Sequence, residues 1–328
     1  MTYMLGKKPA SPLSKKAIKF GDIFNPAKLP TPQLEFGKAD LVKSWGMLGN
    51  DEWGCCVFAE KGHLHMLWSK MGQHKLDLFT TFNVLSDYAA VTGFNASDPE
   101  SDQGTDMKAA AEYHRKIGVI DKNKVRRRVS SYINNAPGDL DQLALCVYLF
   151  GAVEIGVILS NENMTQFDDE KVWTVTGTPV GGHCIPIFGR DGNGDFDSVS
   201  WGRRTKLSGA FLQKQMDEGI TYLSDQTLNS KGIAGGFNRA TLDQMMAKIS
   251  PQVFAVEQPE EEVIRYGFVD LAGKKPNADQ YEVAMRTART WVDKTGYGFM
   301  VGNDKLKPFA DEMAFKIVQA GDDPEETK

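Results

Sequence analysis

The chain has 328 residues, enough for one large domain or two ordinary ones, and 41% of them are hydrophobic and 25% charged, as in an ordinary globular protein. A formal net charge of -5 argues against a general affinity for nucleic acid, because phosphates favour a basic surface. No stretch approaches the roughly 18 apolar residues of a membrane span. Residues 1–10 lack the apolar core of a secretory signal.

Cysteine and histidine usage gives no sign of a disulfide framework or a metal site. The four cysteines are few, irregularly spaced and without a CxxC pair. His63 and His65 are two positions apart and so do not share a helix face, while His74 and His114 lie in polar sequence and are expected at the surface. We therefore predict no metal and no cofactor.

The first 40 residues contain five prolines and little periodicity, which predicts an extended arm that lies over the globular body or serves a partner. A helix is predicted from Cys55 to Met71, with one apolar face that includes Leu64, Leu67 and Trp68. A glycine within this helix, at position 62, costs about 1 kcal/mol relative to alanine and indicates close packing.

Further helices and then strands follow along the chain. Glycine stops and N-capping residues predict helices over 76–93, 106–118 and 139–151. Alternating apolar residues predict strands over 153–159, 184–188 and 198–201, with an Asn-Gly hairpin turn at 191–195 between the last two. Because the helices precede the strands, we expect an α+β fold with segregated layers.

The character of the sequence changes after residue 225. A glycine-rich joint at 232–236 precedes two helical patterns, over 240–249 and 282–295. We therefore predict three regions: an arm over 1–40, a body over 41–225 and a mainly helical extension over 226–328. The body is expected to divide into a helical half, 41–150, and a β half, 151–225.

Two residues stand out for their chemistry. Cys56 opens the first predicted helix, where the amides and the helix dipole would favour a thiolate, although most cysteines are simply buried apolar groups. His183 follows two glycines at the start of a strand, so its imidazole could meet Cys56 across a cleft or could be an ordinary core histidine.

Five short motifs in a fixed order resemble the papain-like cysteine peptidases, especially uncharacterised relatives from phages and prophages. Residues 54–59 resemble the nucleophile segment of that family, and residues 102–105 the loop that borders its cleft. Residues 140–160 resemble its helix and strand pair, 182–184 its histidine strand, and 200–202 the end of its Asn-Ser-Trp-Gly motif. The resemblance covers about residues 41 to 205.

The resemblance implies roles for individual residues. Cys56 would be the nucleophile and His183 the proton carrier, with Asn50, where the family keeps a glutamine, helping to form the oxyanion hole. The remaining implied groups border the substrate or shield the histidine: Gln103, Gly104, Thr105, Gly182 and Trp201. The implied fold has a helical subdomain followed by an antiparallel sheet or barrel.

Two positions depart from the family pattern. The orienting asparagine would fall on Val199, which cannot accept a hydrogen bond from the imidazole. Asp197 lies two residues earlier on the same predicted strand face and is the candidate replacement, while Ser200 is expected to face away. Asn50 has a shorter side chain than glutamine, which alters the oxyanion geometry.

Two functions follow as expectations. The first is a thiol hydrolase that cleaves a peptide or amide bond of a peptide or protein substrate. The second is a virion structural or adaptor protein with a degenerate, inactive papain-like fold that binds other virion proteins through residues 1–40 and 226–328. Both place the protein in the cytoplasm of a bacterial host or in a phage virion, without a membrane partner. Nucleic-acid binding through the basic run 122–128 is a minor alternative.

Overall fold

In a computed structural model, the structure describes residues 3–13, 17–24, 29–72, 75–224, 226–227, 267–270 and 315–318. The chain divides into two units, Met1–Ser250 and Pro251–Lys328. In the second unit, strand β10 (Gly267–Asp270) pairs antiparallel with β11 (Phe315–Val318). The predicted joint at 232–236 and the predicted helices over 240–249 and 282–295 lie outside the described residues.

The helical elements of the first unit are concentrated before residue 151. They are α1 (Phe20–Ile23), the 3-10 turns η2 (Ala39–Leu41) and η3 (Pro99–Ser101), and the helices α2 (Cys56–Met71), α3 (Thr81–Thr92), α4 (Met107–Lys116), α5 (Leu140–Phe150), α6 (Asn161–Asp168) and α7 (Gly209–Gln215).

The strands of this unit mostly follow residue 130. They are β1 (Phe36–Gly37), β2 (Val119–Ile120), β3 (Arg126–Arg127), β4 (Ser131–Asn135), β5 (Val153–Ser160), β6 (Pro179–Arg190), β7 (Phe196–Ser200), β8 (Arg203–Leu207) and β9 (Met216–Leu223). Six of them form an antiparallel sheet in the order β4-β9-β5-β6-β7-β8, with β1 added to β6, and β2 pairs separately with β3. The predicted α+β class is confirmed.

Local signals account for most helix ends. The side chains of Asp106 and Asp139 cap α4 and α5, and Gly93 and Gly151 end α3 and α5 in the left-handed conformation. Helix α3 starts at Thr81 rather than near residue 76, because a capping box joins Thr80 to the third helical residue. The predicted hairpin turn between β6 and β7 is confirmed.

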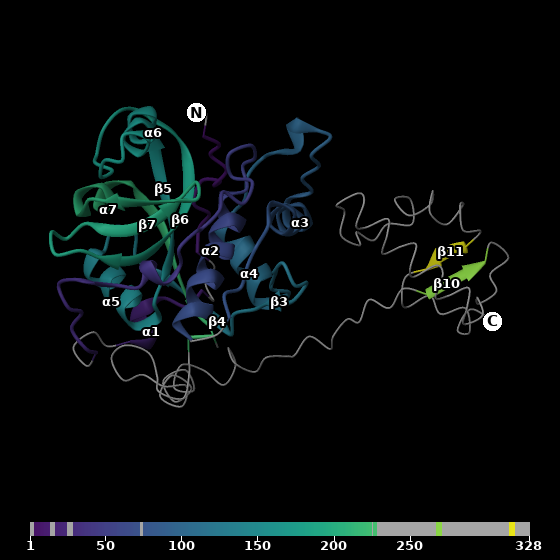
Figure 1. The fold of residues 1–328 in the computed structure, drawn as a ribbon, viewed down its shortest axis with the longest axis horizontal. Helices are drawn as coiled ribbons and strands as arrows, with labels where there is room; N and C mark the ends of the chain where they lie inside the picture. The colour runs from purple at the N-terminus through teal and green to yellow at the C-terminus, as the bar shows by residue number, and fades with distance from the viewer. Residues whose placement is uncertain are drawn as a thin grey trace. The chain divides into compact units, whose positions relative to one another are not determined.

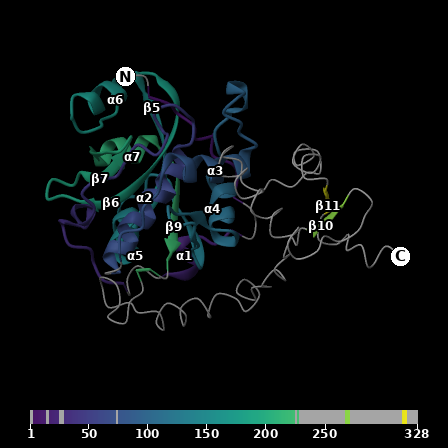
Figure 2. The same ribbon diagram turned by 45° about the vertical axis from the view of Figure 1, so that its right-hand side comes forward.

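Helix α2 lies between the sheet and helices α3 and α4 in both ribbon views (Figures 1 and 2). The sequence predicted one apolar face, but 14 of its 16 residues are buried, because the helix is covered on nearly every side. A Cβ at Gly62 would lie 3.0 Å from Leu48 Cδ1 and 3.3 Å from Phe79 Cγ, which confirms the predicted close packing. Within the described ranges, no helix is long and apolar enough to cross a membrane.

The N-terminal residues are tied to both halves of the first unit. Lys7 pairs with Thr105 on the helical side and with Gly182 of β6 on the sheet side. Farther along, the backbone N–H and side-chain amide of Asn134 both donate to the carbonyl of Ile18. Residues 3–13 therefore lie as an extended segment against the body, which we call the N-terminal segment.

Candidate active site

Cys56 is the first residue of α2 and is completely buried. Burial raises the pKa of its thiol to about 11, although the backbone N–H groups of Cys184 and Gly6 and the Lys7 ammonium all favour the thiolate. Cys184 directly follows His183, and α2 packs against the strand that carries both residues. In the arrangement observed, therefore, Cys56 is a protonated thiol surrounded by groups that would stabilise its anion.

His183 lies in β6 with its ring fully buried. Its Nε2 lies 2.8 Å from Ser200 Oγ, while its Nδ1 has no hydrogen-bond partner within the described residues. The ring stacks on Trp201 with 4.3 Å between centroids and 14° between planes. Burial lowers the pKa of His183 to about 3, so the imidazole is neutral.

Ser200, and not Asp197, is the side chain that bonds the imidazole. The expectation that Ser200 faces away is wrong, because Ile187 pairs with Ser198, which places His183 and Ser200 on the same face of the sheet. The Asp197 carboxylate instead lies 3.6 Å from the Arg204 guanidinium. The imidazole is therefore bonded by the Ser200 hydroxyl.

The end of β7 is shaped by a tight turn. Trp201 and Gly202 both have positive φ, at 44° and 72°, and they join β7 to β8 as a two-residue loop between Ser200 and Arg203. Such a loop matches the twist of the flanking strands, although tryptophan rarely adopts this conformation. The turn holds the indole flat on the His183 ring.

A hydrogen-bond network joins the Cys56 loop to the loop over residues 102–105. Asp102 accepts from the Gly54 N–H at 2.8 Å and from the Tyr88 hydroxyl at 2.5 Å, and that hydroxyl accepts from the Gly104 N–H at 2.9 Å. These bonds tie the Cys56 loop to residues 102–105, and we call the space between these residues and Gly182 of β6, in which the N-terminal segment lies, the groove. The side chain of Gln103 is exposed and bonds the Glu100 carbonyl instead.

The N-terminal segment occupies this groove as an extended strand. Lys7 N–H donates to the Gly182 carbonyl at 3.1 Å, Lys8 N–H donates to the Thr105 carbonyl at 3.0 Å, and Thr105 N–H donates to the Gly6 carbonyl at 2.8 Å. A Cβ at Gly6 would collide with the Gly54 backbone. The groove therefore accepts a peptide backbone at van der Waals contact beside Cys56.

Two side chains anchor the segment on either side of Gly6. The Tyr3 ring stacks on Trp201 at 4.3 Å, and its hydroxyl bonds Asp168. The Lys7 side chain is fully buried and lies 2.7 Å from Asp217 Oδ2. An arm lying over the body was predicted, but not where it binds, because a segment of polar residues and prolines has no pattern that reveals its contacts.

Asn50 lies in the turn that precedes Gly54 and is 4% exposed. Its side-chain Oδ1 is buried without a hydrogen-bond partner among the described residues. A buried amide oxygen without a hydrogen-bond partner is unusual. Its role in an oxyanion hole stays a prediction.

A second set of buried polar groups lies beneath Cys184 and was not predicted. Lys61 of α2 lies 2.8 Å from Glu154 Oε1 of β5, and the thiol of Cys184 donates to the same carboxylate at 3.2 Å. Tyr222 donates to Glu154, and burial raises the pKa of the neighbouring Glu60 well above its usual value. Every one of these residues is buried.

Glu60, Glu154 and Cys184 are close enough together to ligate a metal ion. The Lys61 ammonium already neutralises Glu154, and burial raises the pKa of Glu60 and of the Cys184 thiol well above their usual values. Protonated carboxyl and thiol groups next to an ammonium are poor ligands for a cation. We assign these residues to the buried polar core rather than to a metal centre.

The structure corrects one expectation about a histidine and shows what two arginines of the basic run bind. His114 is not at the surface but fully buried, with its Nε2 2.7 Å from His65 Nε2. In the basic run, Arg126 binds the buried Asp87 and Arg127 lies 2.7 Å from both Asp77 and Asp121. These two arginines are thus engaged in internal ion pairs.

No known family model matches the chain, and no curated protein matches its sequence. Among solved structures, the chain is similar to xylellain, a cysteine protease from Xylella fastidiosa, with a TM-score of 0.49 and 12% identity over 68% of this chain and 96% of that one. It is also similar to procathepsin L2 from the Tenebrio molitor larval midgut, with a TM-score of 0.49 and 16% identity over 67% and 78% of the two chains. Both TM-scores are below 0.5, so neither likeness supports a function for this chain.

Proposed function

We propose that the chain is a thiol hydrolase with a papain-like site, which cleaves a peptide or amide bond through Cys56 and His183. One observation supports this most: a groove beside the buried Cys56 holds an extended peptide segment by backbone hydrogen bonds to Gly182 and Thr105. Bonds to the backbone do not depend on side chains, so they are suited to a peptide substrate.

In the proposed reaction, His183 acts as a general base. Its Nε2 carries the proton that Ser200 Oγ accepts, which leaves Nδ1 free to take the proton of the Cys56 thiol. The sulfur attacks the carbonyl carbon, and the imidazolium then protonates the leaving amine as the C–N bond breaks. Water hydrolyses the resulting thioester and regenerates the thiol.

The negative oxygen of the intermediate needs hydrogen-bond donors. The backbone N–H of Cys56, at the first position of α2, is free of intrahelical bonding by its place in the helix. The Asn50 side-chain amide is the proposed second donor. Trp201, stacked on His183, shields the imidazole from water.

An external peptide can enter only when the N-terminal segment leaves. The substitution Gly6→Val is expected to displace the segment, because a Cβ at Gly6 would lie 1.9 Å from the Gly54 carbonyl oxygen. We expect Gly6→Val to hydrolyse peptides faster than the unmodified chain.

The test is hydrolysis of a fluorogenic peptide library by full-length Gly6→Val. Adding Cys56→Ala should abolish the activity, whereas Cys146→Ala, which removes another buried cysteine, should preserve it. Full hydrolysis by the Cys56→Ala protein, or none by folded Gly6→Val, would overturn the proposal.

Ser200 is proposed as a positioning residue for the imidazole. In the Gly6→Val background, Ser200→Ala should lower kcat about tenfold or more with little change in KM, because the ring loses its tautomer-fixing partner. Ser200→Thr keeps a hydroxyl and should restore part of the rate. An unchanged kcat in Ser200→Ala would remove this role.

The virion adaptor with an inactive fold remains an expectation from the sequence. No feature of the described residues favours virion proteins as partners of residues 1–40 or 226–328. For the hydrolase, the proposed partner is a peptide or protein substrate.

A further inference from the structure

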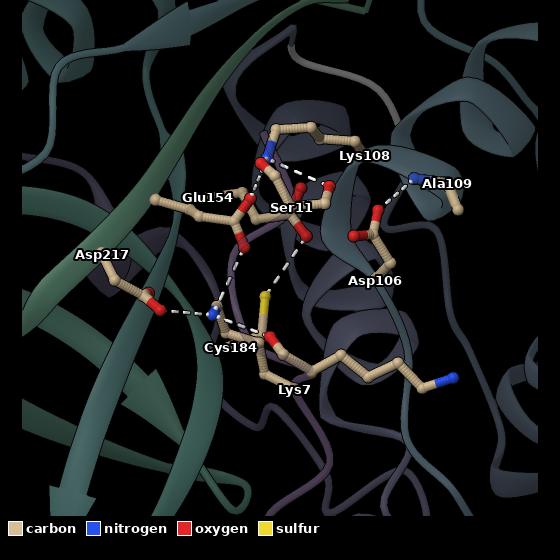
Figure 3. Close-up of polar contacts among 10 residues, drawn as sticks. Lys7, Ser11, Asp106, Lys108, Ala109, Glu154, Cys184 and Asp217 are labelled. Atoms are coloured by element: carbon tan, nitrogen blue, oxygen red, sulfur yellow. Dashed lines mark hydrogen bonds and ion pairs between the residues drawn. The ribbon is translucent and has the colours of Figure 1, made fainter. Parts of the chain in front are cut away.

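The groove beside Cys56 continues into a pocket that encloses the side chain of Lys7. The ammonium lies 2.7 Å from Asp217 Oδ2 and 3.3 Å from Glu218 Oε1, and the whole side chain is inaccessible to solvent. Both carboxylates come from β9, next to β5 in the sheet. Figure 3 shows the ammonium directed at Asp217, with Lys108 above the same cluster.

The stem of Lys7 passes over a strand position that has no side chain. A Cβ at Gly156 of β5 would collide with Cδ and Cε of Lys7 and would lie 2.8 Å from Asp217 Oδ1. Gly156 is the residue directly opposite Glu218 in the β5-β9 ladder. The pocket therefore has room for a long unbranched stem because this one position is glycine.

The charges of the pocket require a cation. Glu218 is 5% exposed, and its Oε2 lies 2.6 Å from the Lys108 ammonium, which also bonds Ser11 of the N-terminal segment. Without Lys7, Glu218 would keep Lys108 as a partner, whereas Asp217 would lose the ammonium that lies 2.7 Å from its Oδ2. Leaving a buried carboxylate without a partner is costly, so the empty pocket favours any ligand that supplies a positive charge.

Lys7 belongs to a segment that binds the groove rather than to the core of the sheet. Its backbone N–H bonds Gly182, whereas its side chain makes the contacts that depend on residue type. Its neighbour Gly6 is the residue that contacts Gly54 beside Cys56. Lys7 is therefore next to the residue that contacts Gly54, two positions before Cys56.

From this juxtaposition we propose that the pocket formed by Gly156, Asp217 and Glu218 recognises a lysine or arginine side chain of the peptide substrate. The proposal rests on the proposed hydrolase function and names its specificity. Lys7 occupies in the resting chain the place that a basic substrate residue takes during reaction.

The direct test uses full-length Gly6→Val and fluorogenic peptides that carry lysine, arginine, norleucine or glutamate at each position in turn. We expect a preference of about tenfold or more in kcat/KM for a basic residue over norleucine at one position, as hydrogen bonds to charged groups provide. Glutamate at that position should give the slowest hydrolysis. Equal rates for lysine and norleucine at every position would overturn the inference while leaving the hydrolase function intact.

Substitution of the pocket gives the matched comparison. Asp217→Asn in the same background should reduce the basic preference to about threefold or less, because the amide keeps the shape but lacks the charge. Asp169→Asn, which changes an exposed carboxylate at the end of α6, should leave the preference unchanged. If Asp217→Asn does not fold, the peptide series alone decides the question.

Binding separates the inference from the hydrolase function. In the full chain with Gly6→Val and Cys56→Ala, a lysine peptide should bind at least about tenfold more tightly than its norleucine counterpart by fluorescence anisotropy. Such binding without hydrolysis in any variant would sustain the pocket and refute the hydrolase. Equal affinity for both peptides would refute the pocket.

A charge reversal at Lys7 tests the pocket without changing any residue that lines it. Lys7→Glu places a third carboxylate in the pocket and should release the segment, raising hydrolysis of lysine peptides. Lys8→Glu makes the same charge change at the exposed neighbouring residue and should have little effect. Equal effects of the two substitutions would contradict a specific pocket for Lys7.

Discussion

Two lysines of this protein are buried against carboxylates, in contrasting settings. Lys61 lies in the middle of α2, 2.8 Å from Glu154 of β5, and both side chains are fully buried. Lys7 lies in the N-terminal segment, and its partner Asp217 keeps 26% of its side chain exposed. Lys61 is fixed by a helix of the core, whereas Lys7 enters its site from a segment that lies in a groove.

The comparison distinguishes an ion pair within the folded core from a site that can bind a ligand. Burial alone lowers the pKa of each ammonium, but the neighbouring carboxylates outweigh burial and raise both pKa values, so both lysines are charged. No ligand can take the place of the Lys61 side chain while the core stays folded, because Lys61 belongs to α2 and is fully buried. Lys7 can be replaced by the side chain of another peptide, provided that the incoming group is also a cation.

The largest expected effect on stability comes from breaking the buried ion pair between Lys61 and Glu154. Lys61→Met keeps the volume but leaves Glu154 buried without its cation, so we expect the free energy of unfolding to fall by about 3–5 kcal/mol. Lys70→Met, a half-buried position in the last turn of the same helix, should change it by less than about 0.5 kcal/mol. Urea denaturation measures both. A loss below about 1 kcal/mol in Lys61→Met would show that the ion pair between Lys61 and Glu154 does not stabilise the core as proposed.

Acid should destabilise the protein through its buried histidines. Burial lowers the pKa to about 4 for His63 and His65, to about 3 for His183 and well below its usual value for His114. Between these values and about 6.5, the unfolded chain binds more protons than the folded one, so stability is lost as pH falls through this window. Each histidine contributes up to about 1.4 kcal/mol per pH unit.

Four carboxyl groups act in the opposite direction, because burial raises the pKa of Glu60, Asp87, Asp195 and Asp197 and so favours the folded state at low pH. The histidines carry the larger change between pH 5 and pH 7, because the pKa of histidine in an unfolded chain, about 6.5, lies in that interval and those of the acids lie below it. Urea denaturation at pH 5 and pH 7 should therefore show lower stability at pH 5. In Gly6→Val the groove is open to water, so His183 should regain a more ordinary pKa and the pH dependence should weaken. Equal stability at the two pH values would contradict the neutral, buried histidines.

A smaller effect on stability is expected from substitution of Lys7. Lys7→Met should lower the free energy of unfolding by about 1–2 kcal/mol, because the segment can detach and let water reach Asp217. Hydrogen exchange should show loss of protection confined to the backbone amides of the N-terminal segment and Thr105. A loss as large as that in Lys61→Met, with exchange throughout the sheet, would make Lys7 part of the core.

Much of the fold could be predicted from local signals. The caps Asp106 and Asp139 and the stop at Gly151 depend on neighbouring residues only and lie where the sequence places them, and α2 begins at Cys56, one residue after the predicted start at Cys55. The predicted single apolar face of α2 was incomplete, because periodicity cannot show that Lys61 has a buried partner, Glu154, 93 residues away.

Candidate residues of the site could be named from the sequence, but the hydrogen-bond partner of His183 could not. Local sequence and the family resemblance single out Cys56 and His183 as candidates, whose catalytic roles stay predictions, but the hydrogen-bond partner of the imidazole depends on the register of β6 against β7. A register shift between Ile187 and Gly189, together with the turn at Trp201, decides that Ser200 faces the ring. The binding of Lys7 depends on tertiary contacts alone and has no local sequence signal.

The most direct test of the account is the rate at which a haloacetamide alkylates Cys56 in the full chain at pH 7, followed by mass spectrometry of each cysteine. In the unmodified chain, the N-terminal segment and the pKa of about 11 should keep Cys56 as slow to react as Cys146. In Gly6→Val, Cys56 alone should react at least about tenfold faster, because the groove opens while the helix N-terminus still favours its thiolate. If Cys56 in folded Gly6→Val reacts no faster than Cys146, the groove over an activatable thiol is refuted.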